Sequence, residues 1–204
     1  MPLYAGGSLA DHIGNGRTMD PQKVWMYGAW IASGLQHLHN SHMLHRDLKP
    51  GNVLLGLRED DIVLSDFEFA RILAPGATAR SQCGTPGFMA PEVEAGKAYS
   101  KTADVYPLGA TLFALLKGDA PPTPVVDQIT PDARLQTAIL KMLDPVPANR
   151  PTLSTFLALP DAEVHLLHRK LAESQHERSA TRALLLGSPG PSITPPASPE
   201  LALA

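Results

Sequence analysis

The sequence predicts a mainly helical fold that contains one small β hairpin. Two long segments, 20–40 and 132–143, carry apolar residues at three- and four-residue spacing, which is the pattern of a helix with one buried face. Two short apolar runs, 53–55 and 62–64, flank a polar turn and have the length of buried strands. We therefore expect an α+β domain in which helices dominate.

Composition bounds the class of protein. A chain of 204 residues with 44% apolar and 18% charged residues suits one globular domain with a tail. A net charge of -3 gives no electrostatic case for nucleic acid or an anionic membrane as a partner. The single cysteine, Cys83, excludes an internal disulfide, and we see no secretory signal or membrane span. The expectation is a cytoplasmic protein.

The first half of the chain is organised around a polar stretch at 45–52. Residues 1–19 are rich in glycine and predict irregular structure with a short helix beginning after Ser8. Asp20 as N-cap and Pro21 at the first helical position begin a long helix that ends near residue 40. This helix leads directly into the polar stretch, and the strand pair follows it.

The second half contains the remaining helices. A mostly apolar segment, 100–117, predicts a buried central helix, which Pro107 should bend or deprive of one hydrogen bond. A last core helix is expected to begin after Thr152, and a charged amphipathic helix at 160–186. From Gly187 onward the proline, serine and glycine content predicts disorder.

Three short motifs occur in one order along the chain. The stretch 45–52 reads HRDLKPGN, 65–68 reads SDFE, and 89–92 reads MAPE. The pattern H-R-D-x-x-x-x-N is the catalytic-loop signature of protein kinases. Over residues 1–159 the chain resembles the C-terminal lobe of a eukaryotic-type serine/threonine protein kinase.

This resemblance implies a division of the chain and a small set of reactive residues. Asp47 would accept or orient the proton of the substrate hydroxyl, and Lys49 would place positive charge on the transferring phosphoryl group. The implied divisions are a kinase C-lobe at 1–159 with a hinge remnant at 1–9, a catalytic loop at 43–52 and an activation segment at 66–92, then a helical extension at 160–186 and a disordered tail at 187–204.

The resemblance also implies ATP and Mg²⁺ as cofactors. Asn52 and Asp66 would hold magnesium, with the hairpin presenting them side by side. The backbone at Tyr4 would face the adenine and Leu54 would lie beneath it. Lys49 and the tripeptide 84–86 resemble the serine/threonine branch. A solvated, acid-rich turn is the alternative for this stretch, and the ordered spacing disfavours it.

Other residues match supporting positions of the family. His45 and Phe67 would stack in an apolar column, which is a structural role. Arg46 would grip a phosphate on the activation segment, for which Thr78 and Ser81 are candidate phosphosites.

Three buried charges and four histidines complete the prediction. Glu92 and Arg150 would form a buried ion pair, and Asp104 would hold the catalytic loop from below. A metal site is disfavoured for the histidines, because no carboxylate or cysteine completes their set. These histidines are His37, His39, His42 and His45.

The sequence also departs from the family pattern. It contains no G-x-G-x-x-G loop and no preceding strand lysine, which form the roof of the nucleotide site in the family. Glu68 replaces the usual glycine after Asp66-Phe67, where a Cβ should restrict the backbone. Tyr106-Pro107 replaces a tryptophan-serine pair. The isolated chain is therefore expected to be close to inert.

Two functional hypotheses follow from these observations. The first is a protein serine/threonine kinase domain that transfers the γ-phosphoryl group of ATP to a protein hydroxyl. The second is a non-catalytic, kinase-like binding or scaffold module (a pseudokinase). Without the upper lobe, an apolar upper face around Leu3, Leu54 and Phe67 would lie open to a protein partner.

Overall fold

The computed structural model describes residues 4–57, 61–122 and 128–185, with side chains described as far as 175. It divides into two compact units, Met1–His168 and Arg169–Ala204, which are described separately. Leu3, the middle of the predicted hairpin turn and the predicted disordered tail lie outside the described residues.

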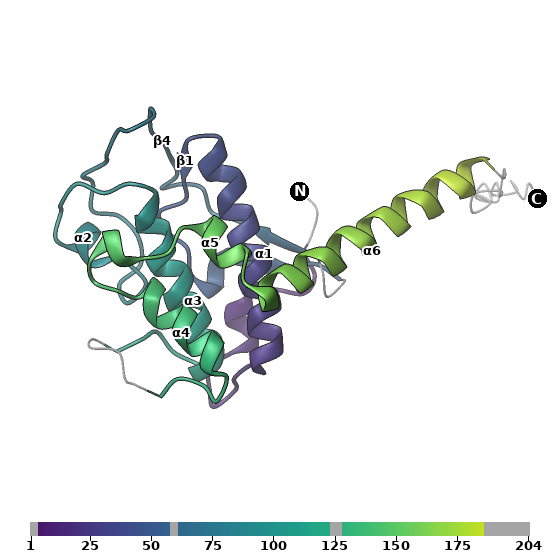
Figure 1. Cartoon of the computed structure of the whole chain (residues 1–204), viewed down its shortest axis with the longest axis horizontal. Coiled ribbons are helices and arrows are strands. Elements are labelled where there is room, and N and C mark those ends of the chain that lie inside the picture. Colours follow the sequence, from purple (N-terminus) through teal and green to yellow (C-terminus); the bar gives the residue numbers. More distant parts are fainter. Residues whose placement is uncertain (1–3, 58–60, 123–127, 186–204) are drawn as a thin grey trace, which may run out of the picture. The chain divides into compact units, whose positions relative to one another are not determined.

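Four helices form the body of the first unit. Helix α1 (Pro21–Asn40) packs against α3 (Val105–Lys117) (Figure 1). Helix α5 (Leu153–Leu157) packs on α1, and helix α4 (Ala133–Met142) packs on α3. The apolar core lies between them. Its fully buried large side chains are Leu9, Trp25, Ile31, Leu35, Leu44, Leu48, Leu108, Leu112, Leu115, Leu135, Ile139 and Phe156.

Helix α1 begins where the sequence predicts. The Asp20 carboxylate accepts a hydrogen bond from the backbone N–H of Gln22 at 2.8 Å, and Pro21 occupies the first helical position. The predicted apolar face is buried. Trp25 and Trp30 are buried as well, because α3 and α5 both pack against α1 and cover more than one face. Burial on several sides makes α1 the central scaffold of the unit.

Helix α3 is shorter than predicted and is preceded by a 3-10 turn, Lys101–Asp104. Pro107 is the third residue of α3. In the first turn of a helix the N–H groups have no intrahelical acceptor, so proline costs no hydrogen bond there. The expected bend or lost bond at Pro107 is therefore wrong. The helix ends at Gly118, whose φ of 85° is the left-handed conformation that suits glycine.

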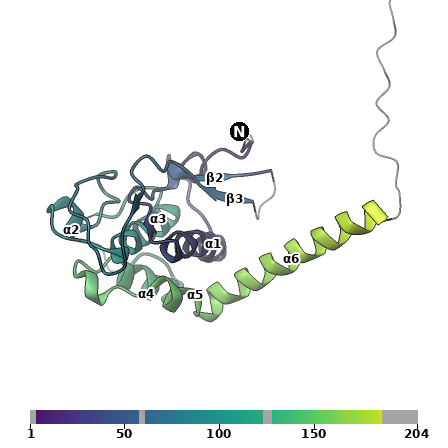
Figure 2. The same cartoon turned by 90° about the horizontal axis from the view of Figure 1, so that it is seen from above.

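The predicted hairpin is present. Strands β2 (Val53–Leu55) and β3 (Ile62–Leu64) pair antiparallel, with Val53 opposite Leu64. Figure 2 shows this hairpin on the opposite side of α1 from α4 and α5. A second pair, β1 (Met43–Leu44) with β4 (Arg71–Ile72), was not predicted, since two-residue strands carry no readable alternation.

The N-terminal segment lies along the hairpin. Gly6 N–H donates to the Leu55 carbonyl at 3.0 Å, and Leu55 N–H donates to the Gly7 carbonyl at 2.8 Å. The short helix predicted after Ser8 is present as η1 (Leu9–His12), with Asp11 capping the Ser8 N–H at 2.7 Å. The remaining short helices are η2 (Pro50–Asn52), α2 (Pro91–Glu94) and η4 (Pro147–Asn149).

The last helix, α6 (Pro160–Leu185), was predicted to be amphipathic. In its first turns Ala162 is buried, whereas Val164 and Leu167 are 46% and 51% exposed. Apolar residues therefore lie on opposite sides of the helix, and the amphipathic prediction is wrong. Among the described residues, no helix is both long enough and apolar enough to cross a membrane.

Candidate active site

The carboxylate of Asp47 is the centre of a hydrogen-bonded cluster on the catalytic loop. Asp47 is only 4% exposed, so its charge requires compensating partners. Its Oδ2 accepts from Asn52 Nδ2 at 3.0 Å and lies 3.0 Å from Lys49 Nζ. Its Oδ1 accepts from the hydroxyl of Thr85 at 2.7 Å. The sequence prediction that Asp47, Lys49 and Asn52 share one loop agrees with this geometry.

Thr85 connects the activation segment to this cluster. Lys49 Nζ donates to Thr85 Oγ1 at 2.7 Å, so lysine, threonine and aspartate form a closed triangle. Sequence reasoning used residues 84–86 only as a marker of the serine/threonine branch and missed Thr85 as a contact of Asp47. Gly84 has a φ of 120°, and a Cβ there would lie 2.9 Å from the Arg46 carbonyl oxygen. The close approach therefore requires glycine.

Asn52 is oriented by its contacts with Asp47. Its Nδ2 donates both to the Asp47 backbone carbonyl at 2.8 Å and to the Asp47 carboxylate. Both acceptors require the amide nitrogen on this side, which leaves Oδ1 pointing away from them. Within the described part of the chain, no hydrogen bond occupies that oxygen.

Asp66 lies next to this cluster because of the hairpin register. Val53 pairs with Leu64, and the Ser65 N–H donates to the Asn52 carbonyl at 2.9 Å. Asp66 is the residue after Ser65, so it follows directly on the residue that binds Asn52. Asp66 is exposed and has a φ of 62°. Arg46 also has a positive φ, 70°. Such strained non-glycine residues concentrate at functional sites.

His45 joins the catalytic loop to the segment that carries Asp66. The ring is buried, its Nε2 lies 3.1 Å from the Ser65 carbonyl oxygen, and its centroid lies 5.2 Å from that of Phe67. Burial lowers the pKa of His45, although Asp104, the Ser65 carbonyl, Asp47 and Asp66 oppose that shift. The His45 ring packs against Phe67, which is 45% exposed, so the structural role predicted for this pair stays a prediction.

Asp104 supports the catalytic loop from beneath, as predicted. It is fully buried and accepts the backbone N–H groups of His45 at 3.0 Å and Arg46 at 2.9 Å. Its Oδ2 also lies 2.8 Å from Nε2 of the buried His39. One side chain at the start of α3 thus fixes two consecutive peptide groups of the loop.

Arg46 links the loop to the middle of the activation segment. Its Nε donates to the Phe69 carbonyl, and its Nη1 donates to Ser81 Oγ at 2.6 Å and to Tyr99 Oη at 3.1 Å. Ser81 is thus the candidate phosphosite that Arg46 reaches. Sequence reasoning missed Tyr99, since a lone buried tyrosine has no motif to mark it.

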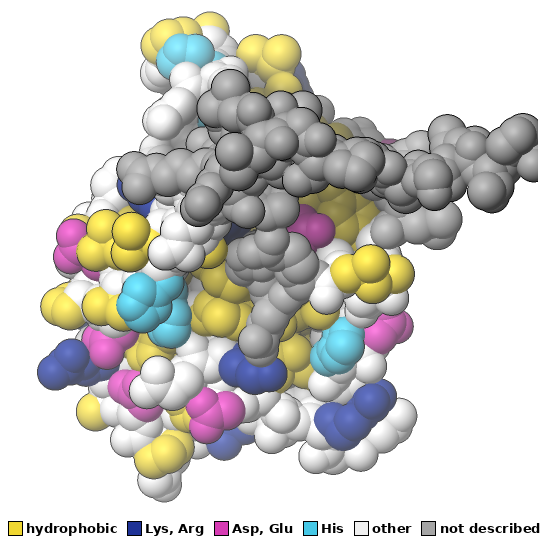
Figure 3. Space-filling view, turned by 90° about the vertical axis from the view of Figure 1, so that its right-hand side faces the viewer, with side chains coloured by type: hydrophobic (Ala, Val, Ile, Leu, Met, Phe, Trp, Pro, Cys, Tyr) yellow, Lys and Arg dark blue, Asp and Glu magenta, His cyan; other side chains and the backbone are white. Residues whose placement is uncertain are grey.

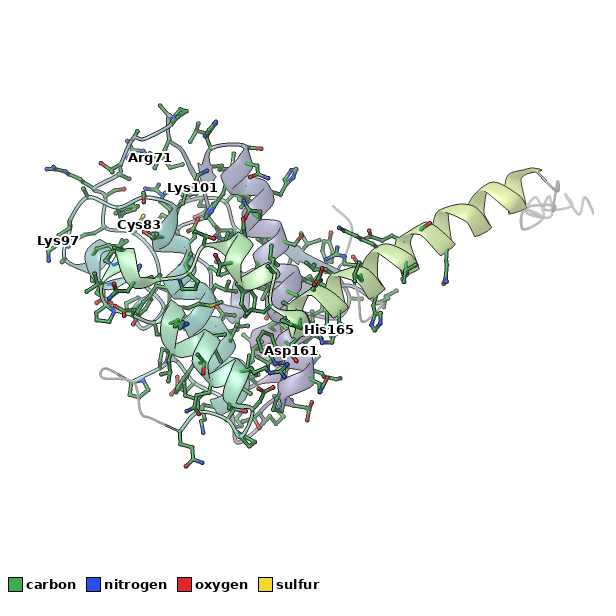
Figure 4. The ribbon with its side chains drawn as sticks, in the orientation of Figure 1. Arg71, Cys83, Lys97, Lys101, Asp161 and His165 are labelled. Carbon is green, nitrogen blue, oxygen red and sulfur yellow. The ribbon has the colours of Figure 1, made fainter. Side chains whose placement is uncertain are left out.

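Thr78 occupies a different place from Ser81. It lines a cavity of about 500 Å³ together with His42 and Lys101. Lys101, Arg71, Lys97 and Cys83 lie on the same side of the unit in Figure 4. Lys101 is therefore the basic neighbour of Thr78, whereas Arg46 is the basic neighbour of Ser81.

Glu92 and Arg150 form the buried ion pair that was predicted. Arg150 Nη1 and Nη2 each donate to one oxygen of Glu92, both at 2.7 Å, and the Arg150 side chain has no exposed surface. Arg150 also donates to the Asp144 and Thr102 carbonyls and lies 5.1 Å above the Tyr106 ring. Removal of one member of such a pair costs about 3–5 kcal/mol, because the other charge is left buried and unpaired.

The predicted nucleotide-facing residues lie beside the hairpin. Leu54 forms an isolated β-bridge with Ser8, and Tyr4, half-buried, lies four residues before Ser8 at the start of a turn. Tyr4 accepts the Gly7 N–H through its carbonyl at 3.2 Å. Leu54 therefore lies inside β2, two residues after Asn52, and the turn that begins at Tyr4 leads into the segment that binds the same strand.

The backbone at Glu68 differs from the prediction. Glu68 is the second residue of a turn closed by a 3.0 Å hydrogen bond from Ala70 N–H to the Phe67 carbonyl. Its φ is not among the positive values; the left-handed residue here is Asp66. A turn of this kind accepts most residues at its second position, so the expected restriction by a Cβ is wrong.

The structure bears on the metal and surface predictions as well. Within residues 4–57, 61–122 and 128–185, no three side chains of the His, Cys, Asp and Glu types gather as metal ligands. In the view of Figure 3, acidic, basic and hydrophobic side chains are interspersed over the described surface.

The chain is similar to known protein kinases. A family model described as "Protein kinase domain" matches residues 1–186. The chain is 40% identical over 119 residues to the serine/threonine-protein kinase ATG1a of Arabidopsis thaliana, covering 57% of this chain and 19% of that protein. It is 36% identical over 129 residues to human serine/threonine-protein kinase ULK1, covering 59% and 12%.

A third relative is the death-associated protein kinase dapk-1 of Caenorhabditis elegans. It is 36% identical over 122 residues, which are 59% of this chain and 9% of that protein. The chain therefore spans less than a fifth of the length of each of these three relatives. The family match extends beyond residue 159 into α6. With the motifs, the anchored catalytic loop and this match together, the chain belongs to the protein kinase domain family.

Proposed function

We propose that this chain is the catalytic lobe of a serine/threonine protein kinase, which transfers the γ-phosphoryl group of ATP to a serine or threonine hydroxyl of a protein. One observation carries the proposal. The buried Asp47 carboxylate is held by Lys49, Asn52 and Thr85 at 2.7–3.0 Å, next to Asp66 at the end of the hairpin. A solvated turn would not fix four polar groups in this way.

Each residue has a role that follows from its contacts. Asp47 is proposed to accept or orient the proton of the incoming hydroxyl, which would replace one of the hydrogen bonds at its carboxylate. Lys49 is proposed to neutralise charge on the transferring phosphoryl group, since its ammonium already lies 3.0 Å from Asp47. Thr85 would keep both side chains in place when the substrate binds.

The donor set suits Mg²⁺. Asn52 offers Oδ1, which is left over after Nδ2 binds Asp47, and Asp66 offers an exposed carboxylate that makes no ion pair within the described residues. Hard divalent cations prefer such oxygen ligands. Bound magnesium would neutralise the negative charge of the phosphates.

We assign residues 1–159 to the lower lobe of the kinase domain, with Tyr4 and Leu54 beneath the adenine. The Gly-rich loop and strand lysine of the family do not occur in these 204 residues. Phosphoryl transfer should therefore require those elements in addition to this chain. A cytoplasmic location and a protein substrate are part of the same proposal.

Phosphorylation of Ser81 is proposed to strengthen the contact that Arg46 already makes. The guanidinium donates to Ser81 Oγ at 2.6 Å, and a phosphate there would offer charged acceptors to the same group. Thr78 is the alternative phosphosite and would face Lys101 in its own cavity.

The test is magnesium-dependent binding of ATP by the 204-residue chain. We expect ATP with Mg²⁺ to raise the melting temperature, and ATP with a chelator to raise it much less. Asp66→Ala and Asn52→Ala should each remove the magnesium-dependent part, since each removes the oxygen ligands of one side chain. Thr137→Ala, on the far side of the fold in α4, is the control and should behave like the parent chain. The proposal fails if millimolar MgATP leaves the parent chain's melting temperature unchanged.

A non-catalytic binding module is the second candidate. The observation that favours it is exposed apolar surface after the hairpin: Phe67, Phe69 and Ile72 are 45%, 39% and 70% exposed. Exposed apolar side chains of this kind are a surface that a protein partner would cover. Failure of the MgATP test with a folded chain would favour this module.

A further inference from the structure

A cavity of about 500 Å³ lies between the residues where β1 begins, the activation segment and the start of the 3-10 turn Lys101–Asp104. Volumes of about 300–1,000 Å³ are typical of small-molecule sites. Of the described residues that line this cavity, none is proposed to take part in phosphoryl transfer, and Arg46, which contacts Ser81, is not among them. The proposed kinase function therefore leaves the cavity without a small-molecule ligand.

One wall of the cavity is apolar and is fixed by the backbone. The Leu73 N–H donates to the His42 carbonyl at 2.8 Å, directly beyond the β1–β4 pair. Leu44 of β1 is 1% exposed, and it lines the cavity together with Leu73 and Pro75. An apolar group would therefore find a preformed surface here.

A second wall carries two hydroxyl groups. Ala79 and Tyr99 exchange two backbone hydrogen bonds, both at 2.9 Å, so Thr78 and Ser100 lie opposite each other one residue beyond this pair. Both residues line the cavity, and Ser100 makes no capping hydrogen bond to the 3-10 turn that follows it. Within the described residues neither hydroxyl has a hydrogen-bond partner, so both can donate to a ligand.

The charge of the lining is positive. Lys101, which Figure 4 labels, and His42 both line the cavity and are exposed. No Asp or Glu occurs among the described lining residues. In the part of the chain that the structure describes, neither side chain forms an ion pair or a hydrogen bond. Together with the two hydroxyls, these groups give four uncommitted donors from three separate segments.

The backbone does not require a histidine at position 42. Helix α1 ends at its C-cap Ser41, and the next residue, His42, has a φ of 57°. This left-handed conformation suits glycine, whereas a residue with a Cβ is strained there. His42 lines the cavity in spite of this strain, which is the arrangement expected of a group that binds a ligand.

We propose that this cavity binds a phosphate monoester of a small apolar group. A phosphate ester carries nearly two negative charges and three strong acceptor oxygens, which suits four donors better than the two oxygens of a carboxylate do. Phosphate alone is much smaller than the cavity, so the ester group would occupy the remaining space against Leu44 and Leu73. The inference does not depend on kinase activity, because its donors are separate from the residues proposed for phosphoryl transfer.

The probe is phenyl phosphate, titrated without nucleotide into the ¹⁵N-labelled 204-residue chain at about pH 7.5, where the phosphate is mostly a dianion. The amide signals of residues 42, 73–78, 100 and 101 should shift saturably, and those of α4 should not. Phenol should bind about tenfold more weakly, since it lacks the interactions with two exposed donors of the cavity, and benzoate should lie between the two. Added salt should weaken phenyl phosphate binding, because Lys101 is exposed.

Two variants remove the proposed donors. His42→Gly removes the ring and suits the positive φ, so it should fold as stably as the parent chain and bind phenyl phosphate about three- to fivefold more weakly. Lys101→Ala should weaken binding by a similar factor and reduce its dependence on salt. Lys97→Ala is the matched control, because it removes an exposed lysine that does not line the cavity and should change neither.

A third variant places negative charge in the cavity. Thr78→Glu adds a carboxylate to the lining at an exposed position, so the chain should remain folded. The carboxylate would pair with Lys101 and repel the phosphate, and we expect at least about fivefold weaker binding of phenyl phosphate. Thr78→Ala removes only the hydroxyl and should have a smaller effect.

Four results would overturn the proposal. They are the absence of saturable shifts at millimolar phenyl phosphate, shifts confined to residues outside the cavity, binding of phenol or benzoate as tight as that of phenyl phosphate, and parent-like binding by both His42→Gly and Lys101→Ala. A short phosphoserine peptide supplies the remaining comparison. Tighter binding of that peptide than of phenyl phosphate would assign the cavity to a phosphorylated protein and end the small-molecule proposal.

Discussion

The catalytic loop and the segment that follows the hairpin adjoin each other but are held in different ways. In the loop, His45, Asp47 and Asn52 are between 0% and 6% exposed. In the segment 66–72, Phe67, Phe69 and Ile72 are between 39% and 70% exposed. The base of the proposed site is thus part of the core, whereas the acid proposed to hold metal lies on an open surface.

The difference reflects where the hydrogen bonds of each region go. The loop binds a buried carboxylate, Asp104, through two backbone N–H groups, and Asn52 binds Asp47 twice. The segment is held mainly by its turn, by the β1–β4 pair and by Arg46 on the Phe69 carbonyl. Regions with fewer buried contacts open at lower free energy. The loop should therefore be preformed, and the Asp66 side should respond to ligand or partner.

The largest expected effect is that of Asp104→Ala, which removes the support of the loop. The substitution leaves the His45 and Arg46 N–H groups and the His39 ring without their acceptor. Since each unsatisfied buried group costs about 1–3 kcal/mol, we expect a loss of about 3 kcal/mol or more in the free energy of unfolding. Urea denaturation measures it.

Asp161→Ala is the matched control for that measurement. Asp161 also pairs with a basic side chain, but Arg134 is mostly exposed, so the loss should stay below about 1 kcal/mol. Asp104→Asn keeps an acceptor oxygen and should fall between the two. Similar losses for Asp104→Ala and Asp161→Ala would contradict the difference between buried and exposed anchors.

A smaller effect is expected from the pH dependence of His45, which bridges the two regions. Burial lowers the pKa of His45 in the folded state, so as pH falls the unfolded chain takes up this proton first. Its contribution to stability is complete well above about pH 6.5 and decreases as the pH falls below that value.

The measurement compares the parent chain with His45→Gln, which does not titrate. The difference in free energy of unfolding between the two should shrink as the pH falls from about 7.5 to about 5. Using the difference removes the contribution of the other seven histidines, since the chain has eight in all. A difference that stays constant, or grows toward acid, would show that His45 is not held neutral.

Much of the fold could be predicted because its elements carry local signals. Asp20-Pro21 marks the beginning of α1, Asp132 caps α4 through the N–H groups of Arg134 and Leu135, and Thr152 caps α5. The same held for the hairpin, whose two apolar runs have strand length. Helix α3 began later than predicted, because an apolar sequence does not separate a 3-10 turn from an α-helix.

The site was predictable only where a motif spans it. Asp47, Lys49 and Asn52 lie within eight residues of one another, so their spacing is visible in the sequence. Thr85 and Tyr99 reach the site across 38 and 53 residues, through contacts with Asp47 and Arg46. Such long-range contacts leave no periodicity or spacing to detect, and they appear only once the activation segment is folded onto the loop.

The smallest expected effect is that of Glu68, in the exposed segment. Because Glu68 has an ordinary turn conformation, Glu68→Gly relieves no strain and adds freedom to the unfolded chain, at a cost of about 0.5–1 kcal/mol. Glu68→Gln keeps the Cβ and removes only the charge, which separates the two contributions.

Since the carboxylate is exposed and screened, Glu68→Gln should change the magnesium concentration needed for ATP-dependent stabilisation by less than about fivefold. Titration of Mg²⁺ against the melting temperature at fixed ATP measures this shift. A larger shift would place Glu68 among the groups that contact the metal, and the open segment would then be more ordered around its ligand than its exposure indicates.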